Sequence, residues 1–281
     1  MTSCHLCRGR EFRPFICEGE WEYVRCLECG LIFLQPQPSI QYLQDHYQDY
    51  LPADPQGAAN WRRLMGQVFA KSAELIEETI PVSGRLLDVG CGYGFFLEAM
   101  ASRGWRVEGI EISATGLSYA REKLGLEVAD KPLPRPDWPD GCFDVITLFY
   151  VIEHLQDPRV VLEEAWRLLR PGGVLLLRWP HTAPIVRLLR PWAEGLKLYQ
   201  APSHLFDFSP STIYKILEQS GFVEIRTTVC GWTRPNSKGA RLAAWLFGNL
   251  GEKLVRLSGG HLLLPGVSKT TLARCGAPSK K

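Results

Sequence analysis

The segment LLDVGCGYG, residues 86–94, constrains the fold of this chain more than any other stretch of its sequence. An apolar run ends at Asp88, and three alternating glycines, Gly90, Gly92 and Gly94, separate it from the next apolar run. A strand that turns through glycines into a helix is typical of the first half of a parallel β–α–β unit. Bare backbone at such a turn lets a ligand lie against the helix N-terminus. The segment therefore predicts a ligand-binding turn in a parallel sheet.

Strand and helix patterns alternate from this segment onward. Short apolar runs predict strands over residues 85–89, 107–110, 143–149, 174–178, 223–229 and 270–274. Helical spacing and capping residues predict helices over 93–102, 113–124, 158–169 and 210–221, and RPGG after the third of these is a stop signal. This order is typical of a parallel sheet with helices on both faces.

The second predicted strand ends at Glu111, whose carboxylate can accept hydrogen bonds from both hydroxyls of a ribose. A dinucleotide-binding fingerprint would need a glycine at position 95, where the chain has Phe95. The sequence therefore predicts a ribose-containing ligand but disfavours a dehydrogenase.

Two cysteine pairs near the N-terminus predict a metal site. Cys4 and Cys7 form one CxxC pair, Cys26 and Cys29 form the other, and 18 residues separate the pairs. This spacing is typical of a four-thiolate zinc ribbon. Four thiolates leave no open coordination position, so we expect a structural zinc ion. So short a segment has little core of its own, and zinc contributes roughly 10 to 16 kcal/mol in small zinc domains.

The other residues of this N-terminal segment disfavour nucleic-acid binding. Residues 1–36 hold four arginines and five glutamates, so they lack the basic surface that phosphate recognition requires. Cys17 lies outside the CxxC pattern, and we expect it to be a small buried apolar residue. After the ribbon we expect an aromatic helix, a linker over residues 51–60 and a helix over 61–79.

Composition and hydropathy indicate the cellular compartment of the protein. No apolar run approaches the roughly 20 residues that a membrane-spanning helix needs. The first fifteen residues contain no apolar block like that of a secretory signal peptide. Hydrophobic residues make up 46% and charged residues 22%, which is typical of a globular protein. We therefore expect a cytoplasmic protein, in which cysteine pairs favour metal ligation over disulfides.

Positive charge is concentrated at the C-terminal end. Residues 231–281 hold nine Lys or Arg and a single acid, whereas the preceding residues hold 23 basic and 29 acidic side chains. Within this region, residues 238–257 predict an amphipathic helix. Its apolar face would hold Leu246, Phe247, Leu250, Leu254 and Leu257, and its polar face Lys238, Arg241, Asn249, Glu252, Lys253 and Arg256.

Two interpretations of this helix stay open. In the first, the apolar face packs on the domain, because Gly248 and Gly251 weaken the helix as a free-standing element. In the second, the helix lies on an anionic membrane at the inner face, with Trp245 as an anchor, or receives a phosphate-bearing acceptor.

The motifs together resemble a known family. DVGCGYG, the acid at Glu111, the block FDVITLFYVIEHLQDP and LRPGG resemble class I S-adenosylmethionine-dependent methyltransferases. CLECGLIFLQPQP with HYQDYL further along resembles a zinc-ribbon subgroup associated with sugar, glycan and secondary-metabolite modification. The resemblance implies an α/β fold with a doubly wound, mostly parallel seven-stranded, Rossmann-like sheet. We expect a zinc ribbon over residues 1–36, a helical connector capping the cofactor site over 37–80, a methyltransferase core over 81–230, and a basic helix with a final strand over 231–281.

The resemblance also implies how S-adenosylmethionine binds. It places Asp88 near the methionine amino group, the glycines at 90, 92 and 94 along the cofactor, and Glu111 on the ribose. Asp130, after a short third strand, is the candidate for contact with adenine, although the following KPLPRPDWPD departs from the family's spacing.

Three histidines follow strands whose carboxyl ends should face the acceptor: His154, His181 and His204. An imidazole suits a general base for a hydroxyl acceptor. His204 is the first candidate, with Asp207 as a group that could orient it, and His154 is the second. Trp179, Tyr150 and Trp192 offer flat apolar surfaces to a sugar or another ring.

We therefore expect an S-adenosylmethionine-dependent methyltransferase that O-methylates a sugar, a glycan or a related small metabolite. One alternative is a ribosomal RNA base methyltransferase with a zinc module, which the acidic ribbon disfavours. Another is a cofactor-binding scaffold without catalysis. The sequence leaves open the acceptor, the choice among oxygen, nitrogen and carbon, and the oligomeric state.

Overall fold

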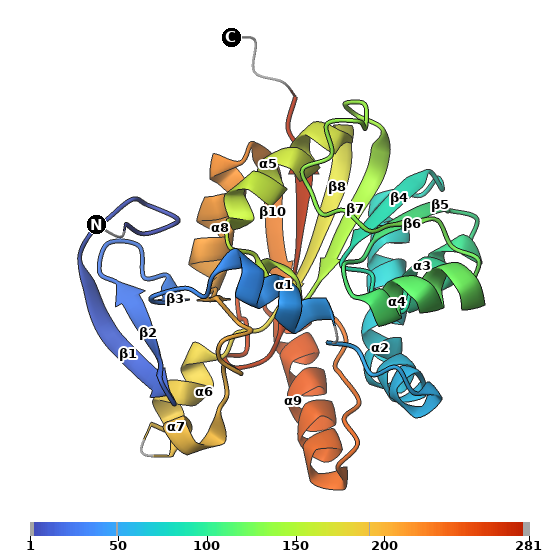
Figure 1. Ribbon diagram of the computed structural model, residues 1–281. Helices are drawn as coiled ribbons and strands as arrows, with labels where there is room; N and C mark the ends of the chain where they lie inside the picture. Colours follow the sequence, from blue (N-terminus) through green and yellow to red (C-terminus); the bar gives the residue numbers. More distant parts are fainter. Residues whose placement is uncertain (1–2, 49, 191, 278–281) are drawn as a thin grey trace.

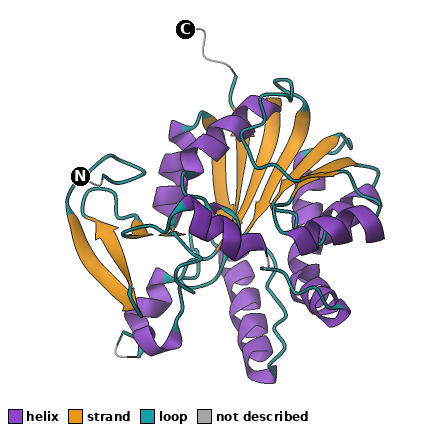
Figure 2. Cartoon of the chain, in the orientation of Figure 1, coloured by secondary structure: helices purple, strands orange, loops and turns teal. Residues whose placement is uncertain are grey.

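The computed structural model describes residues 3–48, 50–190 and 192–277. A seven-stranded sheet with the strand order β10-β11-β8-β7-β4-β5-β6 forms the centre, and helices cover both of its faces (Figures 1 and 2). A second, four-stranded sheet with the order β1-β2-β3-β9 lies beside it. This architecture confirms the predicted fold class.

The central strands lie where the sequence predicts them. They are β4 (Arg85–Val89), β5 (Arg106–Ile110), β6 (Val128–Ala129), β7 (Phe143–Phe149), β8 (Leu169–Trp179), β10 (Phe222–Thr228) and β11 (Lys269–Cys275). Strands β4 to β8 pair in parallel, and β11 runs antiparallel between β8 and β10. Strand β8 begins earlier than predicted, because Leu169 pairs with Phe143 at the start of β7, and the register then shifts before Val174 pairs with Val145.

The helices over the central sheet begin at capping residues. They are α3 (Phe95–Ala101), α4 (Ala114–Ser118) with the turn η1 (Tyr119–Lys123), α5 (Pro158–Leu168) and α8 (Pro210–Gln219). Ser113 caps α4 as predicted, and Ser209 forms a capping box on α8. The short turn η2 (Ile152–His154) follows β7.

Helix α2 (Pro55–Thr79) begins six residues before its predicted start. Asp54 accepts a hydrogen bond from the backbone N–H of Gly57 at 2.8 Å, and Pro55 occupies the first helical turn, where a missing N–H is tolerated. The second half of the predicted linker is therefore helical.

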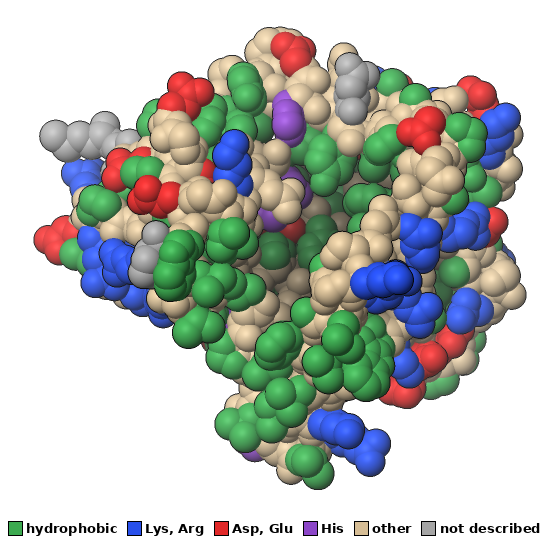
Figure 3. Space-filling model, turned by 90° about the horizontal axis from the view of Figure 1, so that it is seen from below, with side chains coloured by type: hydrophobic (Ala, Val, Ile, Leu, Met, Phe, Trp, Pro, Cys, Tyr) green, Lys and Arg blue, Asp and Glu red, His purple; other side chains and the backbone are tan. Residues whose placement is uncertain are grey.

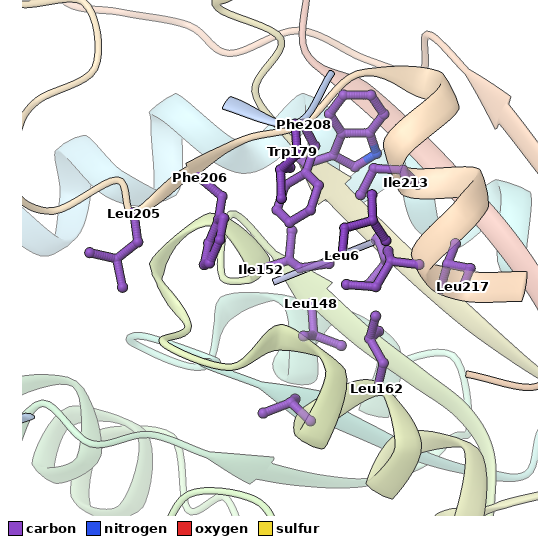
Figure 4. Packing of buried hydrophobic residues seen from close by; sticks show 14 of the residues in the cluster. Leu6, Leu148, Ile152, Leu162, Trp179, Leu205, Phe206, Phe208, Ile213 and Leu217 are labelled. Atoms are coloured by element: carbon purple, nitrogen blue, oxygen red, sulfur yellow. The ribbon is translucent and has the colours of Figure 1, made fainter. Parts of the chain in front are cut away.

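The N-terminal module (residues 3–34) is joined to the central domain through shared strands and a shared core. It contains β1 (Phe12–Glu18), β2 (Trp21–Cys26) and β3 (Ile32–Leu34), and β3 pairs with β9 (Phe206–Asp207). Its Leu6 belongs to the same buried cluster as Leu162 of α5 and Leu217 of α8 (Figure 4). Helices α1 (Ile40–Gln48), α6 (Ala183–Leu188) and α7 (Ala193–Leu196) surround this junction.

Along strand β1, every second side chain points toward the domain. Ile16 and Glu18 are buried, so Cys17 between them faces solvent, and the expectation that it is buried is wrong. The Glu18 carboxylate accepts hydrogen bonds from the backbone N–H groups of Tyr199 and Ala201 at 2.7 and 3.1 Å. This carboxylate ties the module to the loop that leads into β9.

Helix α9 (Lys238–Leu257) has the predicted bounds, and of the two interpretations left open, the one in which its leucine face packs on the domain is wrong. Its buried residues are Gly248 and Gly251, which approach Trp232 and Val229 so closely that added Cβ atoms would lie 2.8 and 3.1 Å from them. The face of α9 that carries the two glycines makes the closest contact with the domain, because only glycine lets the helix backbone approach Trp232 and Val229 at this distance. Most of the large apolar side chains are exposed, namely Leu242, Trp245, Leu246, Phe247, Leu250 and Leu257, whereas Leu254 is partly buried.

We predict that Glu18→Ala lowers the free energy of unfolding by about 2 kcal/mol, because one buried and one partly buried N–H group lose a carboxylate acceptor. Urea unfolding checks this, and Glu20→Ala on the exposed side of the same hairpin is the matched control. Equal unfolding midpoints for the two variants would contradict the structural role of Glu18.

Candidate cofactor and acceptor site

A cavity of about 180 Å³ lies at the carboxyl ends of β4, β5 and β7. Gly90, Gly92, Glu111, Tyr150 and His154 line it from the sheet edge, and Tyr47, Tyr50, Leu51 and Trp61 line it from α1, α2 and the segment between them. In the view from below, hydrophobic and histidine side chains surround a hollow in this face of the molecule (Figure 3). The cavity therefore lies where ligands bind open α/β sheets.

The glycine turn after β4 has the conformation that the sequence predicts. Gly90 and Gly92 have φ angles of +72° and +57°, which only glycine adopts without strain, and both line the cavity. A Cβ atom on Gly90 would lie 2.6 Å from Val151, so any side chain there would displace the opposite wall. Gly94 does not line the cavity, since it starts α3 against Leu126.

Glu111 is held rigidly at the edge of this cavity. One carboxylate oxygen accepts the Gly92 N–H at 2.6 Å, and the other accepts the Ser113 N–H at 2.7 Å. Burial raises its pKa, while these backbone hydrogen bonds lower it. Each oxygen keeps a lone pair, so the carboxylate can accept hydroxyl groups from the cavity.

The other two acids expected around the cofactor lie outside the cavity lining. Asp88 is buried behind the glycine turn, where it accepts a hydrogen bond from the Thr147 hydroxyl at 2.6 Å, and burial raises its pKa to about 8. Asp130 follows β6 and is exposed.

His154 faces the cavity with a fixed tautomer. Its Nδ1 lies 2.8 Å from the carbonyl oxygen of Ser203 and 2.9 Å from the hydroxyl of Tyr47. A carbonyl can only accept, so Nδ1 carries the proton and Nε2 keeps its lone pair. Burial lowers the pKa of His154 to about 4, so the ring is neutral at pH 7.

His204 lies behind His154, with the two ring centroids 4.8 Å apart, and it does not line the cavity. Burial lowers its pKa to about 3. The predicted orientation of His204 by Asp207 is wrong, because that carboxylate accepts the N–H groups of Thr182 and Ala183 at the start of α6. His181 lies at a separate cavity between the N-terminal module and α6.

The predicted aromatic surfaces separate into three environments. Tyr150 lines the cavity and accepts a hydrogen bond from Arg178 at 3.1 Å. Trp179 is fully buried and donates to Thr271, so its expected contact with an acceptor is wrong. Trp192 is exposed on the surface and lies outside the cavity lining.

Glu153 is a buried acid that sequence reasoning did not single out as a site residue. Neither of its carboxylate oxygens has a hydrogen-bond partner among the described residues, and burial raises its pKa to about 8. A carboxylate oxygen of Glu153 and one ring nitrogen each of His154 and His204 lie within 4.8 Å of one another. The only sequence signal was its place beside His154 at the end of a buried strand.

The four cysteines of the two CxxC pairs meet in the N-terminal module. All four sulfur atoms lie within 4.8 Å of one another, and the Cys4–Cys29 and Cys7–Cys26 sulfurs are each 3.5 Å apart. Four converging sulfurs fit the donor set of a tetrahedral metal ion.

A family model described as a methyltransferase domain matches residues 60–226, which is more than half of the chain. The matched range holds the glycine turn, Glu111 and His154. The chain belongs to the S-adenosylmethionine-dependent methyltransferases. The N-terminal module and helix α9 of this methyltransferase lie outside the matched range.

Relatives of this methyltransferase act in different reactions. It is 36% identical over 179 residues to a ubiquinone biosynthesis O-methyltransferase of Pseudomonas aeruginosa, covering 60% of this chain and 77% of that protein. It is 31% identical over 177 residues to a 2-methyl-6-phytyl-1,4-hydroquinone methyltransferase of Synechocystis, covering 60% of this chain and about half, 54%, of that protein. Both relatives are named as methyltransferases, and neither name mentions a sugar.

A solved structure shares the fold at low identity. Phosphoethanolamine N-methyltransferase 2 of Haemonchus contortus, in complex with S-adenosyl-L-methionine, has a TM-score of 0.55 and 18% identity to this chain. The similarity covers 88% of this chain and 62% of that one.

Proposed function

We propose that this methyltransferase transfers a methyl group to a hydroxyl oxygen of a small acceptor bound beside His154. The observation that carries the proposal is that a single cavity is lined by the glycine turn, by Glu111 and by a neutral imidazole. The Pseudomonas relative, named an O-methyltransferase, supports oxygen as the methylated atom.

For the cofactor, we propose that Gly90 and Gly92 lie against S-adenosylmethionine and that Glu111 accepts its ribose hydroxyls. The free lone pairs of Glu111 and the bare glycine backbone fit such a group. Asp88 and Gly94 support the turn from behind, with Asp88 on the side of the methionine amino group. Asp130 stays the proposed adenine contact at the end of β6.

S-adenosylmethionine supplies an electrophilic methyl group, so the protein mainly aligns the acceptor and removes a proton. We propose that His154 Nε2 takes the proton of the acceptor hydroxyl as the oxygen attacks. The Ser203 carbonyl holds the opposite nitrogen protonated, which keeps Nε2 ready to accept. His204 supports the His154 ring from behind.

For the acceptor, we propose a sugar, a glycan or a related small metabolite, as the resemblance of the zinc-ribbon segment suggests. A quinol with a phenolic hydroxyl is the second candidate, because both named relatives modify or serve quinone-type compounds. Aromatic side chains in the cavity wall, including Tyr50 and Trp61, suit either kind of ring. Measuring the release of S-adenosylhomocysteine in the presence of a panel of sugars and a panel of hydroquinones distinguishes the two acceptor classes.

We also propose that Cys4, Cys7, Cys26 and Cys29 hold one structural zinc ion. The convergence of their sulfurs supports this, and four protein ligands would leave the ion no part in the methyl transfer.

We predict that Glu111→Ala weakens binding of S-adenosylhomocysteine by about tenfold or more, because the ribose loses a charged acceptor and the Gly92 and Ser113 N–H groups lose their partner. Isothermal titration calorimetry measures the affinity, and Glu127→Ala, an exposed acid before β6, is the control. Unchanged affinity in Glu111→Ala would refute the cofactor site.

We predict that Cys26→Ser loses zinc and unfolds at a lower temperature, because the remaining thiolates bind the ion less tightly. Metal analysis and thermal unfolding measure both effects, and Cys17→Ser is the control, because Cys17 is exposed and outside the cluster. Full zinc content and an unchanged unfolding temperature in Cys26→Ser would refute the zinc proposal.

We predict that His154→Ala lowers turnover by roughly 10² to 10⁴ while leaving the affinity for S-adenosylhomocysteine intact. In the intact enzyme, turnover should fall only as the pH drops through about 4, because the ring is protonated below its pKa and then cannot accept a proton. The rate with an identified acceptor tests both, with His261→Ala at an exposed position as control. Loss in His204→Ala but not in His154→Ala would assign the base to His204 instead.

A further inference from the structure

Helix α9 leaves an unusual number of large apolar side chains in solvent. Leu242, Leu246, Leu250 and Leu257 are exposed by 58%, 49%, 46% and 84%, and with Trp245 and Phe247, also about half exposed, they form what we call the α9 stripe. The helix contacts the domain through Gly248 and Gly251, so the stripe points away from the core. Contiguous apolar surface of this kind marks an interaction site.

Unpaired positive charge accompanies the stripe. Lys238, Arg241, Lys253 and Arg256 are exposed, and none forms an ion pair in the part of the chain that the structure describes. The single acid of the helix, Glu252, is turned inward and accepts the Gly231 N–H at 2.7 Å. The surface thus combines apolar side chains with cations and has no exposed acid on the helix.

The apolar surface continues beyond α9. Phe247 of α9 and Leu188 of α6 line a cavity of about 600 Å³ between the two helices, and Leu188 is 80% exposed. In the view from below, hydrophobic side chains gather in the lower half of the face, with Lys and Arg side chains beside them (Figure 3). In Figure 1, α9 projects from the sheet edge that holds the candidate site.

We propose that the α9 stripe and its cations dock this methyltransferase on an anionic lipid bilayer. Leucine and tryptophan side chains enter the interface, while lysine and arginine contact anionic headgroups. A second copy of the chain fits less well, since a two-fold contact would bring the same four cations together. No helix in the described part of the chain is long and apolar enough to cross a membrane, so attachment is to one surface.

Co-sedimentation of the full chain with vesicles tests this docking. We expect binding about tenfold or more tighter to phosphatidylcholine mixed with phosphatidylglycerol than to phosphatidylcholine alone, weakening as salt is added. Lys253→Glu with Arg256→Glu should abolish the preference for anionic vesicles. Leu246→Ser with Leu250→Ser should weaken binding at low salt as well.

The control is Val82→Ser, a similarly exposed apolar residue before β4, which should bind vesicles like the unmodified protein. Circular dichroism and binding of S-adenosylhomocysteine show that each variant is folded. Absent binding, or equal and salt-insensitive binding to both vesicle types, would overturn the proposal. So would a dimer that Leu246→Ser with Leu250→Ser converts to a monomer, because the stripe would then be an interface between copies.

Discussion

The carboxylate of Glu111 joins the two turns on which the candidate site depends. It accepts one N–H from Gly92, after β4, and one from Ser113, at the start of α4. A carboxylate buried without such partners would cost several kcal/mol, so the two turns and this side chain stabilise one another. The glycine turn can therefore stay open to a ligand while its backbone keeps a single conformation.

The opposite wall of the cavity depends on the N-terminal half of the chain. Strand β3 pairs with β9, and the Tyr23 hydroxyl donates to the carbonyl of His204 at 2.6 Å. Tyr47 of α1 donates to the carbonyl of Ser203, the same oxygen that accepts from His154. The fold of the N-terminal module and the position of the imidazole are thus coupled through the segment before β9. A module outside the matched methyltransferase range therefore contributes to the position of a side chain that lines the cavity.

Glycines serve two different purposes in this molecule. Gly90 and Gly92 leave bare backbone along the wall of the cavity, whereas Gly248 and Gly251 let α9 approach the domain without side chains between them. In the second case the apolar residues of the helix are displaced outward, because a helix packed by one face must present the other to its surroundings. Packing through glycines therefore produces the exposed stripe.

The sequence by itself determined the parallel sheet, the strand that carries Asp88, the cap at Ser113 and the convergence of the CxxC pairs. The strand and the cap depend on residues close together in the chain. The parallel sheet and the cysteine cluster involve residues farther apart, but the alternation of strands and helices and the CxxC spacing are patterns that predict them without knowledge of the contacts. Only the tertiary structure decided that His154 faces the cavity and His204 stands behind it, that Asp207 caps α6, and that α9 turns its leucines outward. Those outcomes depend on which backbone groups and side chains meet between separate elements, such as Asp207 with Thr182, 25 residues apart, and Tyr47 with His154, 107 residues apart. Periodicity shows that a helix has two faces, but the shape of the partner surface decides which face is buried.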